Sequence, residues 1–112
     1  MKNTYIVGKK GEAKAEDFLK KNGYKIIERN FSTKLGEIDL IAMDKTVLCF
    51  VEVKQKSSKK FGLPREMVTL TKQHKIRMVA ELYLKIYPTK SPVRFDVVDV
   101  LNDEITLIKN AF

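Results

Sequence analysis

Apolar residues recur at helical spacing in two segments of the chain. The first predicted helix spans Lys9–Asn22, and Gly23 follows it as a stop signal. The second spans Thr71–Tyr87, and Pro88 ends it. The apolar stripe of the second helix consists of Ile76, Val79, Ala80, Tyr83 and Tyr87. Each helix therefore has one face that favours packing against a core.

Five further segments have the β-branched and aromatic composition of strands. They are Tyr24–Phe31, Gly36–Ala42, Thr46–Lys54, Val93–Leu101 and Glu104–Ile108. Turns are predicted at residues 32–34, at Asp44-Lys45 and at Asn102-Asp103, and the polar segment 55–65 is predicted to be an exposed loop. The order αβββαββ predicts an α/β fold in which helices flank a mixed sheet, and residues 1–112 are expected to form a single domain.

Composition narrows the class of protein. A chain of 112 residues with 44% hydrophobic residues can bury a core, so a disordered chain is excluded. The one cysteine, Cys49, lies in an apolar run, which excludes an intrachain disulfide and suits a reducing compartment. The first residues, Met1-Lys2-Asn3-Thr4-Tyr5, lead into a charged stretch instead of an apolar signal segment, and no apolar run approaches the ~20 residues that cross a bilayer. We therefore expect a cytoplasmic protein without membrane contacts.

The net charge of +8 is concentrated in two regions. Residues 54–77 contain eight basic residues and one acid, and residues 1–25 contain seven lysines and three acids. Such a footprint is typical of a protein that binds a phosphate backbone, and the alternative is a solvated lysine-rich surface. The candidate nucleic-acid contacts are Lys56, Lys59, Lys60, Arg65, Lys72 and Lys75.

Strand alternation brings acids and a lysine together. Glu52 and Lys54 share one strand face, and Glu37 and Asp39 share another. With Asp44-Lys45 as the turn, Asp39 would stand opposite Phe50 and diagonal to Glu52, with their backbones roughly 7–8 Å apart. Any even loop length keeps these residues on one face of the sheet.

Acids placed so closely repel each other, and a hard cation is the natural explanation for keeping them. Mg²⁺ is usually held by one or two carboxylates, which Asp39 and Glu52 would supply. Lys54 would orient or deprotonate a metal-bound water, or neutralise charge on the phosphate. The structural alternative is that Asp39 and Glu37 cap a turn or pair with surface lysines, while Glu52 and Lys54 form a solvent-facing strand edge.

The helices contribute further candidates. Glu12 shares a helical stripe with Ala15 and Leu19, so it is either an additional metal ligand or an acid that complements the helix dipole. Lys72 and Gln73 stand in the first turn of the second helix. Either they reach a site at the end of the sheet, where they would orient a phosphate or water, or they belong to a solvated helix turn.

Several motifs in this order carry a family resemblance. They are Gly11-Glu12, Arg29-Asn30, Gly36-Glu37-Ile38-Asp39-Leu40-Ile41-Ala42, Phe50-Val51-Glu52-Val53-Lys54 and Arg94-Phe95-Asp96-Val97-Val98. Together they resemble the YraN-like family of small uncharacterised bacterial proteins. This family is a branch of the PD-(D/E)xK, or restriction-endonuclease-like, superfamily, which also contains the archaeal Holliday junction resolvases.

The resemblance implies a restriction-endonuclease-like fold and assigns roles by position. Asp39 and Glu52 would be the metal-binding acids and Lys54 the active-site lysine. Glu12 matches the helix acid of the resolvases, and Gln73 matches the polar residue that many members carry on the following helix. Lys56 departs from the family, which usually has an arginine there, and a lysine cannot bind a phosphate bidentately.

The leading hypothesis is a Mg²⁺- or Mn²⁺-dependent endonuclease that acts on DNA in preference to RNA, with branched or distorted DNA as a candidate substrate. Two alternatives remain open at this point, namely a non-catalytic nucleic-acid-binding module on a nuclease fold and a protein-interaction adaptor. Resolvases act as dimers on two-fold junctions, so a homodimer is a candidate assembly.

Overall fold

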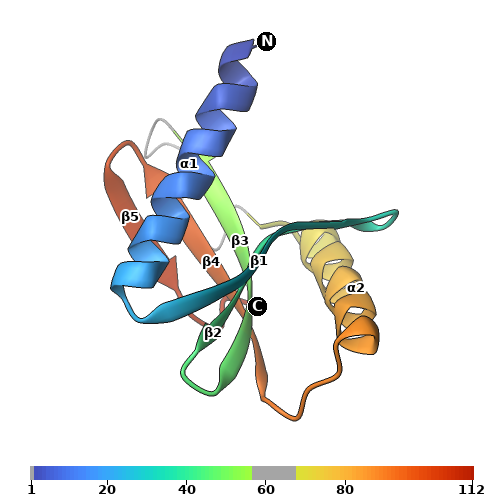
Figure 1. Ribbon diagram of the computed structural model, residues 1–112. Coiled ribbons are helices and arrows are strands. Elements are labelled where there is room, and N and C mark those ends of the chain that lie inside the picture. Colours follow the sequence, from blue (N-terminus) through green and yellow to red (C-terminus); the bar gives the residue numbers. More distant parts are fainter. Residues whose placement is uncertain (1, 57–67) are drawn as a thin grey trace.

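The computed structural model describes residues 2–56 and 68–112, with side chains from residues 11 to 55 and 68 to 112. Its five-stranded sheet has one helix on each face (Figure 1). The elements are α1 (Lys2–Lys21), β1 (Tyr24–Thr33), β2 (Gly36–Asp44), β3 (Val47–Lys56), α2 (Leu70–Ile86), β4 (Val93–Leu101) and β5 (Glu104–Ile108). The predicted order αβββαββ is confirmed.

The sheet is mixed, as predicted. Its strands lie in the order β1-β2-β3-β4-β5, and only the β3–β4 pair is parallel among the described strands. A parallel pair needs a crossover connection, and α2 lies within that connection. The three hairpins β1–β2, β2–β3 and β4–β5 are antiparallel.

Each helix buries its apolar stripe against one face of the sheet. On the α1 side, Ala15 and Leu19 are fully buried in a cluster with Leu40, Val51 and Val98. On the other side, α2 packs against the sheet in a second cluster that contains Ile41, Phe50 and Val97. The α2 residues in that cluster are Ile76, Val79, Ala80 and Tyr83.

Several of the predicted boundaries are wrong. Helix α1 begins at Lys2 instead of Lys9, because residues 2–8 contain no proline that would break a helix. Strand β1 continues through residues 32 and 33, so the first turn lies at Lys34-Leu35. Tyr87 is the C-cap of α2 and is 51% exposed, so it does not belong to the buried stripe.

The turn between β2 and β3 is also shifted. Asp44 pairs with Val47, which makes Lys45-Thr46 the two turn residues, and Lys45 takes the positive φ of 56°. Asp44 stays in the strand because its carboxylate accepts a 2.8 Å hydrogen bond from Arg94. The loop still has two residues, so the predicted parity of the strand faces is kept.

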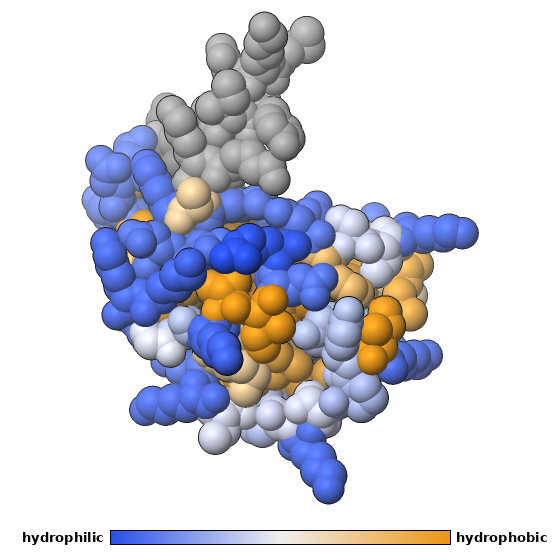
Figure 2. Space-filling model, in the orientation of Figure 1, coloured by the Kyte–Doolittle hydropathy of each residue, from blue (hydrophilic) through white to orange (hydrophobic). Residues whose placement is uncertain are grey.

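Six large apolar side chains of the described residues are exposed. They are Ile27, Leu35, Leu70, Ile86, Tyr87 and Val93. Figure 2 shows hydrophobic patches in a surface that is otherwise mainly hydrophilic. Among the described residues, neither helix is long and apolar enough to span a membrane.

Candidate active site at the end of the β2–β3 ladder

The candidate acids lie where the pairing of β2 and β3 ends. The last paired residues are Leu40 and Val51, and the next residue on each strand is Asp39 and Glu52 respectively. The predicted pairing of Asp39 with Phe50 is therefore wrong, because the shifted turn places Ile41 opposite Phe50. In the observed register Asp39 and Glu52 both follow the last pair directly, whereas the predicted register placed them diagonally to each other.

A backbone hydrogen bond holds the Asp39 side chain in place. Its Oδ2 atom accepts a 2.8 Å hydrogen bond from the backbone N–H of Val53. The carboxylate thus occupies a position at which a paired strand would offer a carbonyl oxygen. Asp39 is fixed on a rigid strand, next to the neighbouring strand that carries Glu52 and Lys54.

Two lysines surround the second acid. Glu52 is only 5% exposed, and its Oε2 atom lies 3.5 Å from the Nζ atoms of both Lys54 and Lys72. These distances exceed the roughly 2.7–2.9 Å of a tight charge-assisted hydrogen bond. Lys54 comes from the same strand, and Lys72 comes from the first turn of α2. A nearly buried carboxylate is therefore neutralised from two sides by loosely bound cations.

The pKa of Asp39 is raised from its ordinary value of 3.8 to about 8. Burial is the largest cause, followed by the negative charge of Glu52, and Glu12 adds a smaller repulsion. The Val53 hydrogen bond opposes this rise because it favours the charged carboxylate. The protein keeps two acids together at an energetic cost.

Glu12 lies at the edge of this group. It shares the α1 stripe with the buried Ala15 and Leu19, as predicted, and its Oε1 atom accepts a 3.0 Å hydrogen bond from the Asn30 side chain. Across residues 11–55 and 68–112, no three metal-binding side chains converge on one point. The compact group consists of Asp39 and Glu52, while the exposed Glu37 lies outside it.

Gln73 is not seen to contact the two acids. Its side-chain Nε2 donates a 3.0 Å hydrogen bond to the Val68 carbonyl, so it stabilises the start of α2. Lys75 is exposed on the same helix. Lys56 is described only as the backbone end of β3, and the candidates Lys59, Lys60 and Arg65 lie outside the described residues.

Sequence reasoning missed a second polar cluster on β4. Arg94 donates to the buried Asp96 through Nε at 2.8 Å and through Nη2 at 2.9 Å, and also to Asp44 and Tyr24. Asp96 also accepts a hydrogen bond from the backbone of Asn110, which fixes the chain after β5. The sequence signal for this cluster was Asp96, an aspartate within the largely apolar strand β4.

Burial and the Asp96 charge set the acid–base state of the groups around this cluster. They raise the pKa of Cys49 to about 12 and also raise the pKa of Tyr24. Both groups therefore stay neutral. In the β3–β4 register Arg94 stands beside Cys49, whereas Asp99, another buried acid that sequence reasoning missed, stands beside Lys54. The Arg94 cluster is thus separate from the candidate site.

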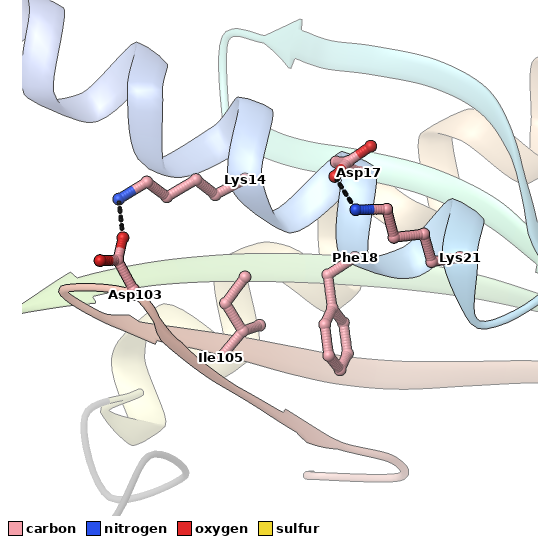
Figure 3. A pocket seen from close by; sticks show the side chains of 6 residues that line it. All are labelled: Lys14, Asp17, Phe18, Lys21, Asp103 and Ile105. Carbon is pink, nitrogen blue, oxygen red and sulfur yellow. Dashed lines mark hydrogen bonds and ion pairs between the residues drawn. The ribbon is translucent and has the colours of Figure 1, made fainter.

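A hollow between α1 and β5 is a third feature of the surface (Figure 3). Phe18 and Ile105 form its apolar part, and Lys14, Asp17, Lys21 and Asp103 also line it. Lys14 pairs with Asp103 at 3.2 Å, and Lys21 pairs with Asp17 at 3.0 Å. Because its lysines already have acidic partners, the hollow does not resemble an anion site. It is lined by none of the candidate site residues.

The fold and the site define a class: an α/β protein whose mixed sheet brings two acids and one lysine together at the end of one strand pair, where a helix adds a second lysine. A profile of the Uncharacterised protein family UPF0102 matches residues 11–100, and the chain belongs to this family. The predicted membership of the YraN-like family is thereby confirmed.

Relatives in the same family align over nearly the whole chain. A UPF0102 protein of Caldicellulosiruptor saccharolyticus is 48% identical over 117 residues, covering 98% of this chain and 99% of the relative. One from Thermodesulfovibrio yellowstonii is 45% identical over 106 residues, covering 95% of each chain. One from Acetivibrio thermocellus is 48% identical over 121 residues, covering 98% of this chain and 93% of the relative.

Proposed function

We propose that this protein is a Mg²⁺- or Mn²⁺-dependent endonuclease of the PD-(D/E)xK type that acts on DNA. The observation that carries the proposal is the pair of acids Asp39 and Glu52, held together beside Lys54 with the pKa of Asp39 strongly raised. Branched or distorted DNA is the proposed substrate, with two copies of the protein acting on a two-fold junction. Free, buried Cys49 is consistent with a cytoplasmic location.

The residues present fit a divalent cation. Mg²⁺ prefers oxygen ligands and keeps several waters, so two carboxylates suffice for the protein's share of the ligands. Asp39 and Glu52 would hold the ion, and its positive charge would relieve the repulsion that raises the pKa of Asp39. When bound, such an ion supplies a Lewis acid that activates water and stabilises charge on the phosphate.

The chain's own groups have separable tasks in this proposal. The Val53 N–H orients Asp39 and favours its charged form. Lys54 lies beside Glu52 with a side chain that is 24% exposed, which suits an ammonium group that meets the phosphate or the attacking water. The net charge of +8 favours association with a polyanion.

One observation favours a second candidate, a nucleic-acid-binding module without catalysis. The ammonium groups of Lys54 and Lys72 both lie 3.5 Å from Glu52 Oε2 and can neutralise it. In a vestigial nuclease, such pairs would be permanent, and the basic residues would bind nucleic acid by counterion release alone.

The test is cleavage of a labelled panel of duplex, single strand, flap, four-way junction and RNA, each with Mg²⁺, Mn²⁺ or EDTA. We expect metal-dependent cutting of DNA that is lost in Glu52→Gln, which keeps the size of the side chain and removes its charge. The matched control is Glu37→Gln, because Glu37 is an exposed acid on β2, and it should cut like the unaltered protein.

The other outcomes contradict the nuclease. Metal-independent binding without cutting would favour the binding module. Neither binding nor cutting would favour the adaptor. Equal cutting by the unaltered protein and Glu52→Gln would place the activity elsewhere in the chain or in a contaminant.

A further inference from the structure

Lys72 occupies an unusual position in the candidate site. Its Nζ atom lies 3.5 Å from Glu52 Oε2, the same distance at which Lys54 approaches the same atom. The three side chains differ in exposure, at 5% for Glu52, 24% for Lys54 and 44% for Lys72. Lys72 is therefore the more exposed of the two lysines, and it comes from α2, whereas Lys54 comes from the same strand as Glu52.

The fold of α2 does not require a lysine at this point. The helix is anchored by buried residues such as Ile76 and Val79, and Thr69 caps it by accepting a hydrogen bond from the Lys72 backbone N–H. A positive side chain in a first helical turn is opposed by the helix dipole, and this turn contains no acid to offset it. The contact that compensates Lys72 is the one with Glu52.

We infer that Lys72 is a substrate-binding residue of this site. In the free protein its ammonium group neutralises Glu52, and when a divalent cation binds Glu52 the ammonium group moves to a nucleic-acid phosphate. This inference rests on the proposed function. An ammonium group and a divalent ion on one carboxylate oxygen repel each other, so the more exposed lysine is the one that leaves. A phosphate beside the ion then offers Lys72 a new anionic partner.

The first half of the test measures metal binding without nucleic acid. Calorimetry with Mn²⁺ should show several-fold tighter binding to Lys72→Ala, because a competing cation has been removed from Glu52. Lys85→Ala is the matched control, since it removes the same charge from an exposed position on the same helix, away from the candidate nucleic-acid contacts. Its affinity for Mn²⁺ should equal that of the unaltered protein.

The second half measures binding of a four-way junction and a duplex in Ca²⁺ at several salt concentrations. Lys72→Ala should bind about tenfold more weakly, and the slope of log affinity against log salt should fall by about 0.9 for one lost phosphate contact. Lys85→Ala should change affinity much less. Lys72→Arg, which keeps the charge, should restore most of the binding.

Lys72→Ala that behaves like Lys85→Ala in both measurements would overturn the inference, and so would weaker Mn²⁺ binding by Lys72→Ala. In either case an unaltered protein that binds Mn²⁺ and cuts DNA would leave the proposed function standing. If the unaltered protein neither binds Mn²⁺ nor cuts the panel, the proposed function fails, and the exchange by Lys72 fails with it.

Discussion

Replacement of Arg94 with alanine is expected to lower the free energy of unfolding by about 3–5 kcal/mol, the usual cost of removing one partner from a buried ion pair. Asp96 is 0% exposed, and the guanidinium group meets both of its oxygens at 2.8 and 2.9 Å. Without Arg94 this carboxylate would have to stay charged in an apolar interior or take up a proton. Asp44 and Tyr24 would each lose a hydrogen-bond partner as well.

Urea denaturation at pH 7 checks this expectation, with Arg29→Ala as the matched control. Arg29 makes two 2.6 Å bonds to Glu16, but its side chain is 54% exposed, so its loss should be far less destabilising. The Arg94 hydrogen bond lowers the pKa of Asp44, and stability from that pair is present above pH 4 and lost on acidification. The difference between unaltered protein and Arg94→Ala should therefore narrow as pH falls. If Arg94→Ala and Arg29→Ala lower the free energy of unfolding equally, the hydrogen bonds of Arg94 do not contribute the expected stability.

Local patterns made most of the fold predictable. The bounds of β4 and β5 and their Asn102-Asp103 turn agree with the prediction, because alternating apolar residues and a strong turn signal act within a few residues. The β2–β3 turn was misplaced because Asp44 looked like a turn residue. Its carboxylate is instead held by Arg94, which is 50 residues away in the chain, and no local pattern reports such a contact.

The grouping of Asp39, Glu52 and Lys54 was predictable for a different reason. Side chains alternate with period two, so a turn displaced by one residue, with its length unchanged, keeps the same residues on the same face. The contact between Lys72 and Glu52 depends on how α2 crosses the sheet, which is a tertiary property. Spacing along the helix indicated that Lys72 could reach the end of the sheet, but it did not identify the acid that it meets.

Replacement of Asp39 with asparagine is expected to stabilise the protein while it abolishes divalent metal binding. The asparagine side-chain oxygen can still accept the hydrogen bond from the Val53 N–H, and the charge repelled by Glu52 is gone. Because the group is partly exposed and its repulsion is shared with Glu52, we expect a gain of roughly 1–3 kcal/mol at pH 8 without metal. Urea denaturation in EDTA measures this gain.

The free energy of unfolding should depend on pH differently in the unaltered protein and in Asp39→Asn. Burial raises the pKa of folded Asp39 to about 8 from an ordinary 3.8, so between these values the folded protein holds a proton that the unfolded chain has released. The stability contribution is therefore present at low pH and falls as pH rises, by the same roughly 1–3 kcal/mol in total up to about pH 8. Asp39→Asn should lack this decline.

Divalent metal should reverse the order of stability. At one hundred times its dissociation constant, Mn²⁺ would stabilise the unaltered protein by about 2.7 kcal/mol and leave Asp39→Asn unchanged. If Asp39→Asn is less stable than the unaltered protein in EDTA, or if its stability has the same pH dependence, then Asp39 stabilises the fold. A variant that is more stable but no longer responds to metal would instead identify Asp39 as an acid kept for function at the expense of stability.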